Sequence, residues 1–85
     1  MYFVYIIYSS SWDKYYIGSC ANLEVRILQH NSGKNISTKH GIPWVVRYTE
    51  VFEIRIEAVQ REKEIKNKKS RKYIEWLIET KKPQG

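Results

Sequence analysis

The chain has 85 residues, of which 42% are hydrophobic and 14% aromatic, and its formal net charge is +6 at neutral pH. This length supports one compact core, so we expect a single domain over residues 1–82 and a frayed tail over residues 83–85. An internal disulfide is excluded because Cys20 is the only cysteine, and no apolar run approaches the roughly 20 residues of a membrane span. No basic segment precedes an apolar run at the start of the chain, so we expect a cytoplasmic protein without a membrane segment.

The first half of the chain predicts two strands followed by a helix. Residues 2–9 are dominated by β-branched and aromatic side chains, and residues 14–20 repeat this composition after a short polar turn. The connection is too short for a crossover, so the two strands should pair antiparallel. Asn22 is a favourable N-cap for a helix that ends near Gly33, and a polar loop occupies residues 34–43.

The second half of the chain predicts one strand and two helices. Residues 44–52 form the strand, residues 55–69 form a helix, and Ser70 caps a last helix that ends near Thr80. The apolar stripe that docks this last helix consists of Tyr73, Ile74, Trp76 and Leu77. The order ββαβαα predicts an α+β fold, in which helices pack a small three-stranded sheet that is mixed or antiparallel. The third strand should lie beside the first or the second.

A carboxylate falls on an apolar helix face in the second half. Three residues mark that face of the helix predicted over residues 55–69: Ile54, Ala58 and Ile65. Glu62 falls on the same face, and burying an unpaired carboxylate costs several kcal/mol. It should therefore meet a cation, either in a salt bridge with Arg26 or Arg47 or as the ligand of a metal ion.

The helix predicted after Asn22 has a similar feature. His30 falls on the stripe marked by Leu23 and Ile27, and Arg26 flanks it one turn earlier. A lone histidine on an apolar face is usually a hydrogen-bonded core residue. A guanidinium beside it favours a second interpretation, in which both groups bind a phosphate.

Two tyrosines can join these groups. If the turn between the first two strands is centred between Ser11 and Trp12, the register places Tyr5 and Tyr16 on the same, helix-facing side. Tyrosine is common in strands, so simple packing is the alternative to a catalytic role.

The positive charge of the chain is unevenly distributed. Ten of the fifteen Lys and Arg residues lie within residues 55–82. The densest run comprises Lys66, Lys68, Lys69, Arg71 and Lys72. Such a run indicates contact with an anionic partner such as nucleic acid, and a solvated helix end that serves only solubility is the alternative.

Four segments resemble the motifs of the GIY-YIG nuclease superfamily. They are Val4-Tyr5-Ile6, Tyr16-Ile17-Gly18, residues 26–31 and residues 61–66. The resemblance extends over residues 2–80 and is closest to small stand-alone bacterial members related to the excision-repair endonuclease C subunit.

The resemblance implies a role for each residue of the candidate site. Glu62 would be the protein ligand of one Mg²⁺ or Mn²⁺ ion, and Tyr5 would be the general base toward the attacking water. Tyr16 would orient that water, Arg26 would neutralise charge on the transition state, and His30 would relay a proton or donate to the phosphate. The implied activity is that of a DNA endonuclease, structure-selective or nonspecific, which leaves 5′-phosphate and 3′-hydroxyl ends in DNA repair, recombination or defence.

The sequence departs from some relatives at three positions. Val4 replaces the usual start of the first motif, Ser19 stands where the excision-repair relatives carry a lysine, and Ile74 falls where several carry an asparagine. The alternative function is therefore a non-catalytic nucleic-acid-binding module of the same fold, and a small interaction protein is a third hypothesis.

DNA is the expected partner, bound mainly through its backbone and with strong salt dependence. Six cations are expected to contact it: Lys34, Lys39, Lys66, Lys68, Lys69 and Arg71. No appended DNA-binding domain fits in 85 residues, so a partner protein is a possible source of specificity. We expect the protein itself to be a monomer.

Overall fold

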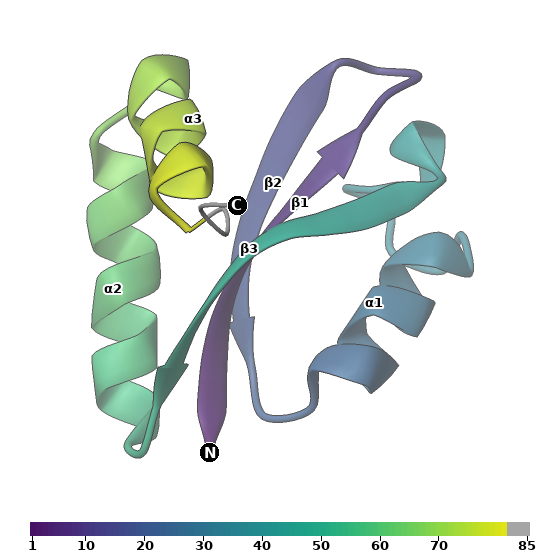
Figure 1. Cartoon of the computed structure of the whole chain (residues 1–85). Helices are drawn as coiled ribbons and strands as arrows, with labels where there is room; N and C mark the ends of the chain where they lie inside the picture. Colours follow the sequence, from purple (N-terminus) through teal and green to yellow (C-terminus); the bar gives the residue numbers. More distant parts are fainter. Residues whose placement is uncertain (82–85) are drawn as a thin grey trace.

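The computed structural model describes residues 1–81, and its elements follow the predicted order ββαβαα (Figure 1). The strands are β1 (Tyr2–Ser9), β2 (Lys14–Cys20) and β3 (Trp44–Phe52). The helices are α1 (Leu23–Asn31), α2 (Arg55–Asn67) and α3 (Arg71–Thr80), and a 3₁₀ turn, Lys39–Gly41, lies in the loop before β3. The α+β class is thus confirmed, whereas the tail predicted over residues 83–85 lies outside the described residues.

The sheet is antiparallel throughout, and β1 is its central strand. Its order is β2-β1-β3, so the third strand lies beside the first. Ser9 pairs with Lys14, which centres the hairpin turn between Ser11 and Trp12 as predicted.

The register of the hairpin decides which side chains share a face. Tyr5 lies opposite Gly18, and Ile7 lies opposite Tyr16. Side chains alternate between the two faces along a strand, so Tyr5 and Tyr16 point to the same face of the sheet. The prediction that these two tyrosines share a side is therefore confirmed.

Helices cover both faces of the sheet, and each face has its own core. Helix α1 packs on one face, and α2 and α3 pack on the other (Figure 1). The core under α1 contains Tyr5, Ile7, Cys20 and Trp44. The core under α2 and α3 contains Val4, Ile6, Ile17, Tyr48, Ala58, Ile65 and Leu77. Consecutive residues of β1 therefore enter different cores.

The helix boundaries follow their capping residues. Asn22 Oδ1 accepts a hydrogen bond from the Val25 backbone N–H at 3.1 Å, and Ser70 Oγ accepts one from the Tyr73 N–H at 3.1 Å. Gly33, with φ of 82°, follows α1 in the left-handed conformation that glycine favours. All three boundary signals were predicted from the sequence.

Two residues predicted on apolar helix faces are exposed instead. Ile54 is 56% exposed because it precedes α2 in an extended conformation, where helical spacing does not apply. Trp76 is 58% exposed, since the apolar face of α3 is centred on Leu77. The partly buried neighbours on that face are Tyr73, Ile74 and Ile78. Helix α2 also ends two residues before the predicted Lys69, which has a positive φ of 48°.

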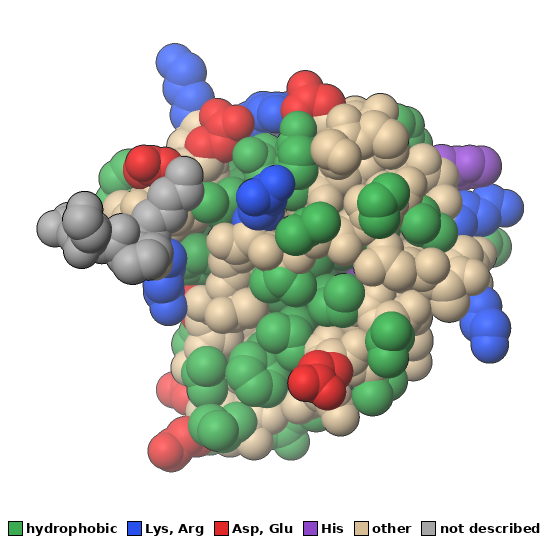
Figure 2. Space-filling model, turned by 45° about the vertical axis from the view of Figure 1, so that its right-hand side comes forward, with side chains coloured by type: hydrophobic (Ala, Val, Ile, Leu, Met, Phe, Trp, Pro, Cys, Tyr) green, Lys and Arg blue, Asp and Glu red, His purple; other side chains and the backbone are tan. Residues whose placement is uncertain are grey.

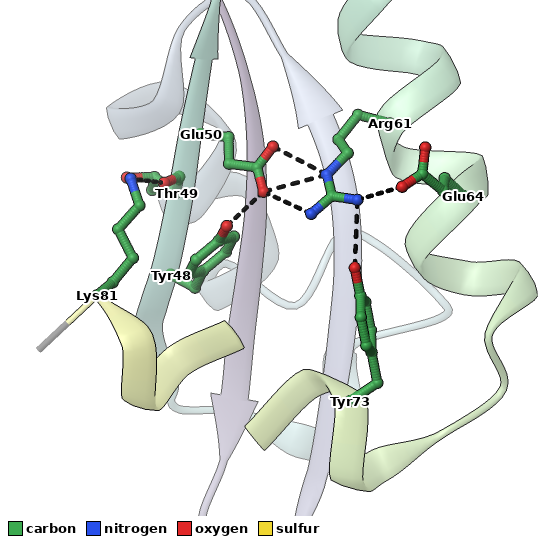
Figure 3. Close-up of polar contacts among 7 residues, drawn as sticks. All are labelled: Tyr48, Thr49, Glu50, Arg61, Glu64, Tyr73 and Lys81. Atoms are coloured by element: carbon green, nitrogen blue, oxygen red, sulfur yellow. Dashed lines mark hydrogen bonds and ion pairs between the residues drawn. The ribbon is translucent and has the colours of Figure 1, made fainter. Parts of the chain in front are cut away.

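A partly buried ion pair fastens α2 to the sheet (Figure 3). Arg61 Nε lies 2.9 Å from Glu50 Oε1, and its Nη2 lies 3.0 Å from Glu50 Oε2. Tyr48 also donates to Glu50, and Arg61 Nη1 donates to the Tyr73 hydroxyl at 3.3 Å. Burial alone raises the pKa of Glu50, but the hydrogen bonds from Arg61 and Tyr48 outweigh it and hold that pKa below its usual value. The pair joins β3, α2 and α3 at the residue next to Glu62.

The surface of the molecule is not uniformly basic. On the face drawn in Figure 2, hydrophobic side chains are spread through the middle, and most of the Lys and Arg side chains project from its edges. Within residues 1–81, none of the helices is long and apolar enough to cross a membrane.

Candidate active site

Tyr5 lies at the centre of the candidate site. Its side chain is 1% exposed, and its hydroxyl lies 2.8 Å from His30 Nε2. Gly18 faces it across the hairpin, where a Cβ atom would come within 2.3 Å of the Tyr5 hydroxyl oxygen. The glycine of the second motif is thus required because the phenol occupies the space of a side chain.

His30 has a partner on each ring nitrogen. Its Nδ1 lies 2.9 Å from Thr38 Oγ1, and both residues are almost fully buried. The Thr38 carbonyl accepts a hydrogen bond from Trp44 Nε1 at 2.7 Å, which fixes the loop beneath the imidazole. Thr38 was not predicted, and it stands in a polar loop without any spacing that marks it as buried. The expected burial of His30 on the α1 face is confirmed.

The electrostatics of the site keep Tyr5 and His30 neutral. Burial raises the pKa of Tyr5 to about 12, although hydrogen bonding and charge from Arg26 act against it. Burial and the positive charge of Arg26 both lower the pKa of His30. The two groups are therefore a phenol and a neutral imidazole at physiological pH.

Tyr16 completes the group on the α1 face. Its ring centroid lies 5.1 Å from that of His30 and 6.3 Å from that of Trp44, both in edge-to-face arrangements. Four of the five predicted catalytic residues, namely Tyr5, Tyr16, Arg26 and His30, therefore gather on one side of the sheet.

Glu62 reaches the sheet from the other side. It accepts a hydrogen bond from Ser19 Oγ at 2.5 Å, and Lys66 Nζ lies 2.6 Å from its second oxygen. The alternative of a salt bridge to Arg26 or Arg47 is wrong, because Glu62 pairs with Lys66 one turn along α2. Burial by itself raises the pKa of Glu62, but hydrogen bonds from Lys66 and Ser19 outweigh it, so that pKa lies below its usual value.

The edge of β2 separates Glu62 from the two phenols. Ser19 follows Gly18 in the strand, so its side chain points to the opposite face. Lys66 connects the two sides, since its ammonium contacts Glu62 and lies 6.0 Å from the centroid of the Tyr16 ring. The five predicted residues thus flank one strand edge and do not line a single closed pocket.

The donor set restricts the kind of metal ion that fits. Within residues 1–81, no three His, Cys, Asp or Glu side chains come together as a ready-made cage. Glu62 is a single, partly exposed carboxylate, with 18% of its side chain accessible. This arrangement suits Mg²⁺ or Mn²⁺, which are commonly held by one or two carboxylates together with substrate phosphate and water. An ammonium already occupies one oxygen, so a cation can reach the carboxylate.

A cavity beside these groups is lined by two arginines. It has a volume of about 250 Å³ and lies where the end of β2 meets the first turns of α1 and α2. Arg26 and Arg55 line it together with Ser19, and within residues 1–81 neither arginine forms an ion pair with an acid. The cavity therefore has two arginines without acidic partners in its lining, which favours an anion as its occupant, and Arg55 was not predicted.

The six predicted DNA contacts do not form one surface. Three of them, Lys66, Lys69 and Arg71, line a groove along the exposed edge of β2. Lys14 lines it too, and Asp13 is its acidic member. Arg71 is partly neutralised there by Asp13 at 2.7 Å.

The other three predicted contacts lie elsewhere. Lys68 sits over the Tyr73 ring at 5.4 Å and lines a separate hollow with Lys63. Lys34 and Lys39 are exposed in the loop between α1 and β3.

The fold and the candidate site define a small α+β domain built on a hairpin that bears two tyrosines. The model of the GIY-YIG family, described as the GIY-YIG catalytic domain, matches residues 1–74. The chain belongs to this family, as the sequence motifs predicted.

Similar proteins share the same name and nearly the same length. A UPF0213 protein of Staphylococcus haemolyticus is 41% identical over 66 residues, which are 76% of this chain and 79% of that protein. A UPF0213 protein of Halobacterium salinarum is 36% identical over 67 residues, or 78% of this chain and 86% of its own. The solution NMR structure of a UPF0213 protein from Bacillus halodurans matches with a TM-score of 0.60 and 31% identity, covering 95% of this chain and 86% of that one.

Proposed function

We propose that the chain is a divalent-cation-dependent endonuclease that hydrolyses phosphodiester bonds in DNA, structure-selectively or without sequence preference. One observation carries the proposal, namely the contact at 2.8 Å between the buried Tyr5 hydroxyl and His30 Nε2, beside Arg26. A buried phenol with a proton acceptor and a cation next to it is equipped for proton transfer at a phosphate. Membership of a catalytic-domain family supports the same function.

The chain's own residues account for the proton of the attacking water. A phenol with a pKa of about 12 seldom ionises alone at neutral pH. The step requires the His30 tautomer in which Nε2 accepts that proton and Nδ1 carries a hydrogen toward Thr38 Oγ1. In the same step, the Tyr5 oxygen takes a proton from the water while the water oxygen bonds to phosphorus. The bond from phosphorus to the 3′ oxygen breaks, and this oxygen takes a proton from solvent, leaving 5′-phosphate and 3′-hydroxyl ends.

Positive charge meets the phosphate from two directions. Arg26 binds it from the α1 side, where the cavity shared with Arg55 has room for a phosphate group. Tyr16 orients the water on the same face. Glu62 would hold the Mg²⁺ or Mn²⁺ ion, which supplies charge neutralisation at the phosphate when bound.

The groove along β2 supports DNA as the substrate. Lys14, Lys66 and Lys69 line it beside the candidate site, so a phosphate backbone that passes the site meets further cations. The contacts are to the backbone, which favours little sequence preference.

A second candidate function is a nucleic-acid-binding module of the same fold without catalysis. The contacts of Glu62 favour it, since Ser19 and Lys66 occupy both carboxylate oxygens. The lysine that excision-repair relatives carry at the position of Ser19 is also missing.

Cleavage assays distinguish the two functions. We expect the wild-type protein to nick supercoiled plasmid, and to cut branched or flapped oligonucleotides, in Mg²⁺ or Mn²⁺. Glu62→Ala and Tyr5→Phe should abolish cleavage while DNA binding persists. Nicking that survives Glu62→Ala would contradict the assignment, and DNA binding without cleavage by the wild type would favour the binding module.

A further inference from the structure

Lys66 is the residue that links the two sides of the candidate site. It follows Glu62 by one turn of α2, so the helix itself brings the two side chains together. Its ammonium lies 2.6 Å from Glu62 Oε2 and 6.0 Å from the centroid of the Tyr16 ring. A cation therefore already lies between the Glu62 carboxylate and the Tyr16 ring.

The two oxygens of Glu62 differ in what holds them. Oε1 accepts a hydrogen bond from the Ser19 hydroxyl at 2.5 Å and is tied to β2, whereas Lys66 is the only donor to Oε2 among residues 1–81. A Mg²⁺ ion binds a carboxylate oxygen at about 2.0–2.1 Å. An ammonium and a divalent cation on the same oxygen repel each other, because their charges then lie only a few ångströms apart. Lys66 and a metal ion therefore compete for Oε2.

The Lys66 side chain is free to leave Glu62. It is 47% exposed, and Glu62 is its sole hydrogen-bond partner within the part of the chain that the structure describes. The Tyr16 ring offers a cation–π position on the catalytic side. The groove that Lys66 lines with Lys69 and Lys14 lies on the path proposed for the phosphate backbone.

We propose that Lys66 is the exchangeable occupant of the Glu62 site. A divalent cation binds Glu62 by displacing the ammonium, and the displaced ammonium then contacts a substrate phosphate beside Tyr16. Lys66 is thus a positioning residue that weakens metal binding in the free protein and supports turnover in the complex. This inference rests on the proposed function, because it takes Glu62 as the metal ligand.

The two roles predict opposite effects of a single substitution. In Lys66→Gln, Mg²⁺ or Mn²⁺ should bind the free protein about threefold to tenfold more tightly, because the competing cation is gone. The same variant should cleave DNA at least about tenfold more slowly at saturating metal, since a phosphate contact is lost. Lys66→Arg keeps a cation at this place and should bind metal as the wild type does.

Metal binding is measured on the protein without DNA, by titration of Mn²⁺ followed by electron paramagnetic resonance and by calorimetry with Mg²⁺. Lys63→Gln is the matched control, because Lys63 lies next to Glu62 in α2 and acts on it only through its charge. The inference is supported if Lys66→Gln binds the metal ion more tightly than the wild type, while Lys63→Gln and Lys66→Arg bind it about as the wild type does.

Three results would overturn the inference. Unchanged or weaker metal binding by Lys66→Gln contradicts the competition. Equal tightening by Lys63→Gln attributes the effect to net charge alone. Metal binding that persists in Glu62→Gln would show that Glu62 is not the metal ligand, which contradicts both the inference and the role of Glu62 in the proposed function. Tightening without any DNA cleavage would uphold the inference on Lys66 and count against the endonuclease.

Discussion

Among single residues, the hydrogen-bonded series from Tyr5 through His30 to Thr38 is central to the proposed chemistry. Each link is a hydrogen bond between almost fully buried side chains, at 2.8 and 2.9 Å. Helical spacing predicted His30 on the buried face of α1, since its position follows from local geometry. Thr38 could not be predicted, because a residue 8 positions away in an irregular loop meets the imidazole only after the loop has packed.

Removal of the Thr38 hydroxyl tests the hydrogen bonds that link Thr38, His30 and Tyr5. In Thr38→Val the volume is kept and His30 Nδ1 loses its partner, so the free energy of unfolding should fall by about 1–3 kcal/mol. Turnover should fall as well, while DNA affinity stays near the wild type. Urea denaturation and single-turnover cleavage measure the two effects. Ser37→Ala, in the exposed neighbour, is the control, and an equal loss there would contradict a specific role for Thr38.

The buried imidazole also predicts how stability depends on pH. The pKa of His30 in the folded protein lies below its ordinary value of 6.5, because burial and Arg26 disfavour the charged ring that Tyr5 and Tyr16 also face. As the pH decreases below about 6.5, His30 is protonated in the unfolded chain before it is protonated in the folded protein. The free energy of unfolding therefore decreases as the pH is lowered through this range, and His30 adds no pH dependence above it. The lowered pKa values of Glu50 and Glu62 add a further loss only below about pH 4.5.

Urea denaturation between pH 4.5 and 8 measures this dependence. The midpoint should be flat above about pH 6.5 and should decrease between pH 6.5 and 5 in the wild type. In His30→Gln the decrease over that window should be smaller. An equally steep decrease in the variant would assign the proton to another group.

At the scale of elements, two neighbouring residues determine the orientation of α2. Arg61 binds Glu50 on β3, and Glu62 binds Ser19 on β2. Consecutive helical residues point about 100° apart, so these contacts hold the helix from both sides of the central strand. The rotation that places Glu62 at the edge of β2 thus depends on a residue outside the candidate site.

Arg61→Gln should therefore affect both stability and cleavage. It leaves the carboxylate of Glu50, of which 18% is exposed, without its bidentate partner, and should cost about 1–3 kcal/mol of unfolding free energy. Cleavage should fall more than DNA binding because Glu62 loses its fixed position. Glu64→Gln removes the other, 59% exposed partner and should cost less than about 0.5 kcal/mol. Thermal denaturation and cleavage assays compare the variants, and similar losses in both would refute this role.

At the scale of the whole molecule, the distribution of positive charge should decide how DNA lies on the protein. The groove along β2 lies beside the candidate site, whereas the adjacent lysine of the basic run, Lys68, lines a different hollow. The turn at Lys69, with its positive φ of 48°, directs two consecutive lysines to different surfaces. Charge density along the sequence therefore overstates the number of cations that one DNA backbone can meet.

Neutralising each lysine separately tests this arrangement. Lys69→Gln should weaken DNA binding severalfold and reduce the slope of log affinity against log salt by about 0.9, the value for one phosphate contact. Lys68→Gln should change both quantities much less. Fluorescence anisotropy with a labelled duplex at several salt concentrations measures the slopes. A larger effect of Lys68→Gln would place the DNA on the other side of α2.

The order of the elements, the helix caps at Asn22 and Ser70, and the shared face of Tyr5 and Tyr16 could all be predicted from the sequence. These features depend on local conformational preference and on strand periodicity, which short stretches of chain contain in full. The partners of His30 and Glu62 could not be predicted in this way, because they meet only when loops and helices pack on the two faces of the sheet. Periodicity predicts that a polar group is buried, but the packing of distant segments determines which residues form hydrogen bonds or ion pairs with it.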